Sequence, residues 1–348
     1  MDAIQSTPAW GGRNAYGAPF HKLDIKAQIA VLVKELGRLH LHRPKSLGFR
    51  SQRAREKLAY MVVAQLAEEG FKLQTLLTLK QTHITAVLQR WQREELAAAT
   101  IQTRISQLRW LCDALGKVGM VRDPKFYGLA PETVARTYVA TEDKSWSSKG
   151  IQFDALLDKL CQFDAMVGVQ LKMMEAFGLR MSEAILIKPW QSDQGSSLRV
   201  EAGTKGGRMR NVQIRTEHQR AVLEEAKVFA AQTAKGNLVQ PGMRPDQARR
   251  RMFYVCEKFG ITKAQLGVTT HGLRHQRAND TYESIAGVPS AVRGGKFPER
   301  ELDIEARHQV TQDLGHARLS ITTAYTGARK RGRPGPFKPL PKQGNFDF

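Results

Sequence analysis

Apolar residues recur at three- and four-residue steps over much of the chain, a spacing that places side chains on one face of an α-helix. One such series consists of Ala54, Leu58, Met61, Val62 and Leu66. We expect this helix to end at residues 68–70, where two glutamates precede a glycine, and a further helix near residues 83–97. From about residue 22 to residue 130, the pattern predicts an all-helical domain.

The clearest apolar stripe lies between residues 100 and 115. Its members are Ile101, Ile105, Leu108, Cys112 and Leu115. Thr100 precedes them and is a suitable N-cap. The opposite face carries Thr103, Arg104 and Gln107, whose side chains could contact DNA in a major groove. The alternative is an ordinary solvated face, because polar helix faces usually contact only water.

The pattern changes after residue 140. Residues 141–150 are polar and without periodicity, which is typical of a linker. A long helical pattern follows from Ile151 to Phe177, and Gly178 stands where a left-handed residue would end that helix. The sequence therefore predicts a second domain that begins near residue 151.

A β-hairpin is predicted within this second domain. Residues 197–203 and 209–215 look like short strands, and the Gly-rich segment 204–208 joins them. Helices resume near residues 217–233 and 245–258. The expected fold class is α+β, mainly α, with a helical domain followed by a mostly helical domain that contains a small antiparallel sheet.

Composition and charge narrow the class of protein. The 348 residues include 54 Lys and Arg against 33 Asp and Glu, a formal net charge of +21, with 41% hydrophobic and 25% charged residues. This composition excludes wholesale disorder, and no apolar run is long enough to cross a membrane. The charge predicts a polyanionic partner, nucleic acid first, although a solvated basic surface is the alternative.

The cysteines and the N-terminal residues indicate the cellular compartment of the protein. The cysteines are Cys112, Cys161 and Cys256, an odd and widely spaced set that fits neither a disulfide framework nor a zinc site. Residues 1–30 lack the basic head and apolar stretch of a signal peptide. We therefore expect free thiols and a cytoplasmic protein.

Four short segments carry the chemistry, and each is weak on its own. They are Gly178-Leu-Arg-Met-Ser-Glu183, the hairpin tip with Lys205, Thr270-His-Gly-Leu-Arg-His275, and Leu314-Gly-His316 followed by Tyr325. Taken singly, such residues are usually surface, turn or core residues. In this order and local context they resemble the tyrosine recombinase (phage integrase-like) family, most of all the integrases of integrating genetic elements. The resemblance spans roughly residues 80–327 and is loose in the helical N-terminal part.

The resemblance implies a site-specific DNA recombinase that works without ATP or metal. Tyr325 would attack the scissile phosphate, giving a 3′-phosphotyrosyl intermediate and a free 5′-OH, before strand exchange and religation. Guanidinium groups present planar forks of permanent donors that suit a phosphate. The implied roles are phosphate contacts for Arg180, Arg274 and His316, proton transfer for His271, and protonation of the leaving oxygen by Lys205.

The neighbouring residues are given supporting roles. Glu183 is expected to hold a helix start or the arginine beside it, and His275 to pack behind Arg274. The separation between Arg274 and His316 is longer than the family leads us to expect, and the excess falls in residues 287–307. This insertion is either a tolerated surface loop or a loop that contacts DNA or a neighbouring subunit.

The resemblance and the composition together predict five segments. These are a flexible arm (1–20), a helical core-binding domain (21–140), a linker (141–150), a catalytic domain (151–327) and a basic, Pro-rich tail (328–348). The tail contains Arg331-Gly-Arg333-Pro, which resembles an AT-hook for the narrow A·T minor groove. A basic tail held by charge alone, or docked on a neighbouring subunit, is the alternative.

The resemblance also implies partners. They are double-stranded DNA with specific recombination sites and three further copies of the chain, which would form a homotetramer on a Holliday junction, with room for an accessory directionality factor. The implied location is the nucleoid of a bacterium or of a host of mobile elements. Two alternatives stay open: a type IB topoisomerase-like nicking-closing enzyme, and a non-catalytic DNA-binding or architectural protein on the same fold.

The absence of a carboxylate cluster with metal-ligand spacing predicts that no metal or other cofactor takes part. Strand cleavage should therefore proceed at an unchanged rate in excess EDTA, measured on a labelled duplex. A loss of cleavage that added Mg²⁺ restores would contradict this prediction.

Overall fold

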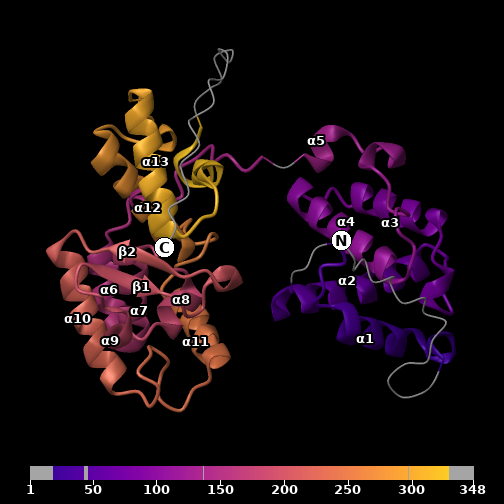
Figure 1. Cartoon of the computed structure of the whole chain (residues 1–348), viewed down its shortest axis with the longest axis horizontal. Helices are drawn as coiled ribbons and strands as arrows, with labels where there is room; N and C mark the ends of the chain where they lie inside the picture. The colour runs from indigo at the N-terminus through magenta and orange to yellow at the C-terminus, as the bar shows by residue number, and fades with distance from the viewer. Residues whose placement is uncertain (1–18, 43–45, 136, 297, 329–348) are drawn as a thin grey trace, which may run out of the picture. The chain divides into compact units, whose positions relative to one another are not determined.

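The computed structural model describes residues 19–42, 46–135, 137–296 and 298–328 (Figure 1). The chain divides into two compact units, Met1–Thr137 and Tyr138–Phe348. The first unit is helical, as expected. Its α-helices are α1 (Ile25–Leu36), α2 (Phe49–Glu68), α3 (Gln81–Arg93), α4 (Ala98–Ala114) and α5 (Pro131–Val134), with 3-10 turns η1 (Phe20–Lys22), η2 (Leu76–Thr78) and η3 (Pro124–Tyr127).

The core of the first unit is built from the predicted apolar faces. Residues from both stripes are buried in it, including Leu58, Leu66, Ile101 and Leu108. Trp91 of α3 is fully buried, and its indole Nε1 donates a hydrogen bond to Gln65 at 2.9 Å. Because a buried indole N–H is costly to leave unpaired, this bond fixes how α3 packs on α2.

Three boundaries in the first unit differ from expectation. Helix α4 begins at Ala98, so Thr100 lies inside the helix and is not its N-cap; the alanines before it are strong helix formers and extend the first turn. Helix α3 begins at Gln81 and ends at Arg93, shortly before Glu95 adopts a positive φ of 49°. Phe20 is fully buried, so the expected arm is too long at its C-terminal end, and residues 1–18 lie outside the described part.

The second unit is mainly helical and contains one two-stranded antiparallel sheet among the described residues. Strands β1 (Ser197–Val200) and β2 (Arg210–Gln213) pair with Val200 opposite Arg210. The longer helices are α6 (Phe153–Phe163), α7 (Ala165–Phe177), α10 (Glu217–Ala231), α11 (Pro245–Lys258), α12 (His271–Ala286) and α13 (Arg300–Leu314). The short elements are η4 (Ser147–Lys149), α8 (Met181–Leu186), α9 (Pro189–Ser192), η5 (Lys205–Gly207), η6 (Ala291–Arg293), η7 (Leu319–Thr322) and α14 (Thr323–Thr326). The expected mainly helical fold with a small sheet is confirmed.

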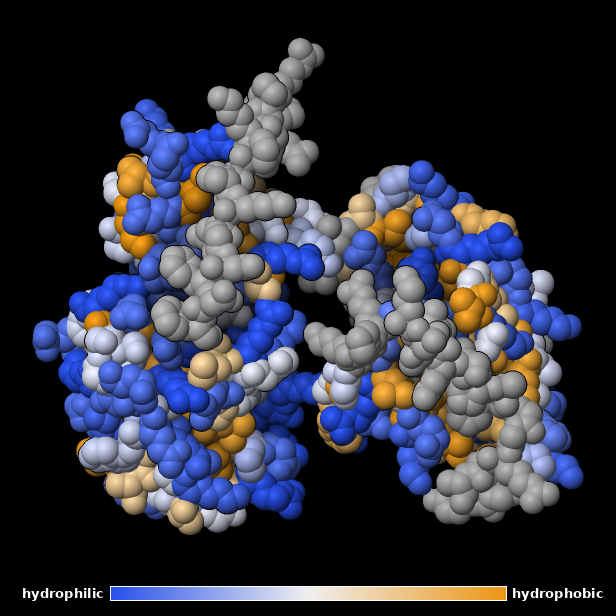
Figure 2. Space-filling view, viewed as in Figure 1, coloured by the Kyte–Doolittle hydropathy of each residue, from blue (hydrophilic) through white to orange (hydrophobic). Residues whose placement is uncertain are grey.

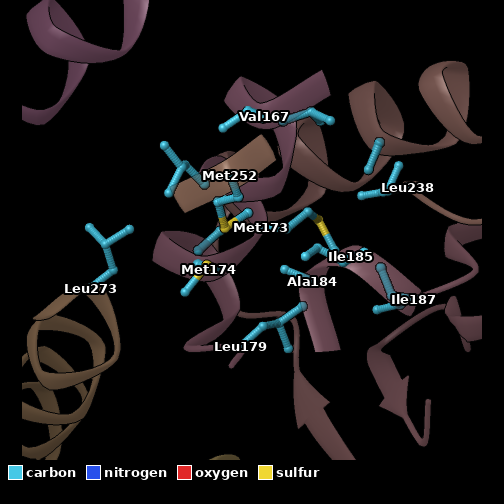
Figure 3. Packing of buried hydrophobic residues seen from close by; sticks show 14 of the residues in the cluster. Val167, Met173, Met174, Leu179, Ala184, Ile185, Ile187, Leu238, Met252 and Leu273 are labelled. Carbon is cyan, nitrogen blue, oxygen red and sulfur yellow. The ribbon is translucent and has the colours of Figure 1, made fainter. Parts of the chain in front are cut away.

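Helix α7 is the centre of this unit and is buried along most of its length. Met173 and Met174 of α7 lie beside Ile185 of α8 and Met252 of α11 in the apolar cluster of Figure 3. Unbranched methionines fill irregular gaps well. This packing places the end of α7, and therefore the Gly178 turn, at a defined position in the unit.

Two expectations about the start of the second unit are wrong. The predicted helix from Ile151 to Phe177 is two helices, because Asp164 leaves the helical region at φ −153° and its carboxylate caps α7 through the Val167 backbone N–H at 3.0 Å. The polar segment 141–150 is packed into the unit and is no free linker: Trp146 is buried and its Nε1 donates to the Thr269 carbonyl at 2.8 Å.

Residues 287–296 and 298–307 are part of the folded unit, which contradicts the alternative of a simple surface loop. Ser290 is fully buried, and so is most of Arg307. The last part of the segment forms the start of α13, which lies alongside α12 (Figure 1). Whether this segment touches DNA or another subunit stays a prediction.

The surface differs in character from these cores. Figure 2 shows hydrophilic residues over much of the visible face, with hydrophobic ones in separate groups. Within the described ranges, no helix is both long and apolar enough to cross a membrane.

Helices α6 and α7 approach so closely that a methyl group changes their packing. A Cβ on Gly168 would lie 2.3 Å from the Cys161 Sγ. We predict that Gly168→Ala lowers the stability of the unit by about 1–3 kcal/mol. In a Cys161→Ala background the same change should instead stabilise by up to about 1 kcal/mol, because alanine favours the helix. Calorimetric unfolding of the four proteins measures this, and an equal effect in both backgrounds would contradict it.

Candidate active site

The end of α7 positions the first arginine. Gly178 adopts φ +61°, as the sequence predicts, and so reverses the chain into α8. Arg180 then occupies the N-cap position of α8 with its side chain half-buried. The carbonyl of Gly178 accepts a hydrogen bond from Arg274 Nη1 at 2.5 Å. The same turn therefore presents one arginine and anchors another.

Glu183 is fully buried, and its carboxylate binds two arginines. Oε1 accepts from Arg180 Nη1 at 2.7 Å and from Arg210 Nη1 at 3.0 Å. Oε2 accepts from the Arg180 backbone N–H and from Arg210 Nη2, both at 2.8 Å. Burial alone would raise the pKa of Glu183, but the hydrogen bonds and charges of Arg210 and Arg180 outweigh it and lower the pKa to about 2.

Arg210 is a site residue that the sequence analysis did not identify. It lies on β2 with its side chain buried, and its Nε donates to the Asp313 carbonyl at 2.8 Å. Asp313 in turn precedes the Gly315-His316 turn, so Arg210 links the hairpin to that turn. The available signal was an arginine at an inward position of an alternating strand, where a buried charge requires a partner.

Lys205 lies at the hairpin tip in η5 and is exposed. It makes no hydrogen bond or ion pair with the residues that the structure describes. Its positive charge is nevertheless close enough to contribute to lowering the pKa of His316. The lysine is therefore near the site and free to turn toward a bound ligand.

Arg274 is completely buried, and its guanidinium joins three segments. Nη1 bonds to Gly178, Nη2 donates to the Leu314 carbonyl, and Nε donates to the Tyr325 hydroxyl at 3.3 Å. A guanidinium has five N–H donors, so one donor on each terminal nitrogen has no acceptor among the described residues. Burial lowers the pKa of Arg274 to about 10, so the group is charged at neutral pH.

Three histidines surround the ring of Tyr325, which is itself buried. Ring centroids lie 4.6 Å away for His275, 5.5 Å for His316 and 6.1 Å for His271. His271 begins α12 and is open to solvent on one side, whereas His275 lies one turn further on and is buried. The structure thus brings together five of the six expected catalytic side chains, with Lys205 at the edge.

The histidines are held neutral. Desolvation, followed by the charges of Arg274 and Arg180, lowers the pKa of His271 to about 4 and that of His316 to about 3. Desolvation and then the neighbouring His271 lower the pKa of His275 to about 3. His316 Nε2 is buried and has no hydrogen-bond partner in the described part of the chain. A neutral imidazole can accept a proton, and His316 has a nitrogen that is available to a ligand.

The expected DNA-contact residues lie elsewhere. Thr103 of α4 is exposed, and its hydroxyl donates to the Ala99 carbonyl at 2.8 Å. Arg104 packs over the Trp91 ring at 5.3 Å, while Gln107 is half-buried. All three belong to the first unit, so their contact with DNA stays a prediction. Arg331 and Arg333 lie outside the described residues.

Comparison with known families identifies both units. A model described as "Phage integrase, N-terminal" matches residues 29–121, and one described as "Integrase" matches residues 137–280. Together they cover about two-thirds of the chain. The second match includes Arg180, Lys205, His271 and Arg274 but ends before His316 and Tyr325. No curated protein matches the sequence.

Solved structures share the fold at low sequence identity. A lambda integrase (75–356) dimer bound to a COC′ core site matches with a TM-score of 0.57 and 12% identity, over 90% of this chain and 99% of that chain. XerH recombinase in a post-cleavage complex with a palindromic difH substrate gives 0.54 and 14%, over 86% and 80%. The Tn1549 transposon integrase (82–397) with circular intermediate DNA gives 0.51 and 13%, over 87% and 96%.

The contacts of Glu183 predict a defined acid sensitivity. Because its pKa is lowered from 4.5 to about 2 in the folded chain, Glu183 stabilises the fold above about pH 5, and this contribution, about 3 kcal/mol, is lost as the pH falls toward 2. Glu183→Gln should cost about 3–5 kcal/mol at pH 7, since it leaves the buried Arg210 uncompensated.

This difference should shrink toward pH 3, as measured by urea unfolding at each pH. Glu201 is an exposed glutamate on the same hairpin, and Glu201→Gln serves as the matched control with a near-zero difference throughout. A Glu183→Gln protein as stable as the wild type at pH 7 would contradict the assignment.

Proposed function

The chain belongs to the tyrosine recombinases of the integrase type, and we propose that Tyr325 is the nucleophile with which it cuts and rejoins DNA at specific sites. The observation that carries this proposal is the contact between the Tyr325 hydroxyl and Nε of the buried Arg274. Arg274 is oriented by two carbonyl groups and still has unused donors. Nucleophile and phosphate-binding group are therefore adjacent before any DNA binds.

The side chains support each half of a phosphoryl transfer. The Tyr325 oxygen forms a bond to phosphorus, the bond from phosphorus to the 5′ oxygen breaks, and the products are a 3′-phosphotyrosine and a 5′-OH. Neutral His271 accepts the phenol proton, and Lys205 protonates the leaving oxygen. Arg180, Arg274 and His316 donate to the non-bridging oxygens as charge develops on them.

Religation reverses the same steps with another 5′-OH as the nucleophile. The phosphotyrosine conserves the bond, so rejoining requires no ATP. The exposed position of Lys205 on the hairpin fits this role, because the lysine can approach the leaving oxygen after DNA binds. Glu183 and His275 act through Arg180 and Tyr325, by orienting the first and packing against the second.

The proposed partner is duplex DNA, bound by a homotetramer that exchanges strands through a Holliday junction. A solved lambda integrase tetramer bound to a Holliday junction shares this fold, which supports the proposal for this chain. The alternative, a type IB topoisomerase-like enzyme, would relax supercoiled DNA without joining two sites. The match of the first unit to the N-terminal domain of phage integrases favours recombination.

We predict that Tyr325→Phe abolishes covalent attachment to a nicked suicide duplex while DNA binding stays within about twofold, because only the hydroxyl is lost. Denaturing gels measure the adduct, and gel shifts measure the binding. The control is Tyr254→Phe, which removes the hydroxyl of an exposed tyrosine on α11 and should form the adduct normally. An adduct that persists in Tyr325→Phe, or none in the wild type, would contradict the proposal.

A further inference from the structure

The helix that carries the nucleophile is too short to hold itself in place. Helix α14 consists of Thr323–Thr326, a single turn between η7 and Gly327. One isolated turn is unstable in water, because nucleating a helix costs more than one turn of hydrogen bonds returns. The position of Tyr325 must therefore be set by contacts from other segments.

One set of contacts comes from the loop at the start of the segment 287–307. Asn279 of α12 donates from Nδ2 to the carbonyls of His275 at 2.9 Å and Tyr325 at 3.4 Å. The Oδ1 of the same amide accepts from the buried Ser290 hydroxyl at 2.6 Å. Since a carbonyl can only accept, the carbonyls of His275 and Tyr325 fix which end of Asn279 faces Tyr325, and Ser290 holds the other end of the amide in place.

A second set comes from α13. The buried Arg307 donates from Nη1 to the Thr326 hydroxyl at 2.9 Å and to the Gly327 carbonyl at 3.0 Å, directly after the nucleophile. Its Nε donates to Asp303 at 3.0 Å. Asp303 also accepts from the Tyr282 hydroxyl at 2.5 Å. The buried Asp303 carboxylate thus orients the Arg307 guanidinium, and Nη1 of that guanidinium binds the end of α14.

The loop itself is anchored by charge. Arg293 forms ion pairs with Asp280 at 2.7 Å, and with Asp143 and Glu283 at 3.2 Å each. Asp143 belongs to the segment that precedes α6, whereas Asp280 and Glu283 belong to α12. Arg293 therefore ties the loop to two separate parts of the same unit.

We propose that the segment 287–307 is an intramolecular brace for the nucleophile, in which Ser290 and Arg307 are positioning residues that hold Tyr325 beside Arg274. This rests on the proposed function, since it assigns a role in strand cleavage. The brace supplies from within the chain the restraint that α14 lacks.

The Thr326 hydroxyl offers a sharp test, because valine has its shape without the acceptor. We expect Thr326→Val to slow single-turnover cleavage of a nicked suicide duplex at saturating protein by about tenfold or more, with the dissociation constant for DNA within about twofold. Thr326→Ser keeps the hydroxyl and should restore most of the rate. The matched control, Thr323→Val, removes a hydroxyl of the same turn that donates only to the Ser320 carbonyl and should cleave normally.

A second variant tests the other contact. Ser290→Ala removes the hydrogen bond that holds Oδ1 of Asn279 in place and should likewise lower the cleavage rate without weakening DNA binding. Ser284→Ala, which removes a hydroxyl bonded only to the Thr281 carbonyl of α12, is its control. Thermal unfolding separates positioning from general instability: the rate should fall in variants that are still fully folded at the assay temperature.

A Thr326→Val protein that cleaves at the wild-type rate would overturn the brace while leaving the proposed function intact. A wild type that forms no adduct would instead overturn both.

Discussion

The carboxylate of Glu183 accepts hydrogen bonds from two arginines while it is closed off from solvent. Through Arg180 it fixes the start of α8. Through Arg210 it fixes the start of β2, directly after the hairpin loop, and, by way of the Asp313 carbonyl, the turn that carries His316. Three segments that are distant in sequence therefore depend on one buried group. Because one negative charge faces two positive ones, the arrangement also leaves the site positive.

This excess of positive charge adds to the desolvation that keeps the neighbouring histidines neutral. Desolvation and the neighbouring arginines keep His271 and His316 neutral, so they do not add to the repulsion. A bound phosphodiester would supply the negative charge that the site lacks, and it could accept hydrogen bonds from the unused donors of Arg274 and His316. The net charge of +21 has the same sign as the site, so the charge of the chain favours the approach of a polyanion.

Local patterns in the sequence predict much of this fold. The predictions are wrong where contacts between residues distant in sequence determine the structure. The stripe from Ile101 to Leu115 faces the core because helical periodicity is a local property. The burial of Trp146 depends on the Thr269 carbonyl, far along the chain, so a polar segment was mistaken for a linker. The break at Asp164 is hidden because apolar residues continue on both sides of it.

In the candidate site, too, residues in local motifs could be predicted, whereas residues that act through distant contacts could not. The six expected catalytic residues are recognisable because each lies in a short motif. Arg210 has no such motif, and its role follows only from the carboxylate and carbonyl that it reaches across the fold. In the sequence, the proposed brace of Ser290 and Arg307 was apparent only as a longer separation than expected between Arg274 and His316. Its meaning depends on Asn279 and Thr326, which are identified as its contacts by the folded structure alone.

We propose that this site transfers a DNA phosphoryl group to Tyr325. Peptide mapping by mass spectrometry, after the wild-type protein is trapped on a suicide duplex and digested with protease and nuclease, tests it most directly. We expect a single modified peptide with the nucleotide phosphate on the Tyr325 hydroxyl. Attachment at any other residue, or a modified Tyr325 peptide that forms equally well when Arg274 is replaced by Ala, would contradict it.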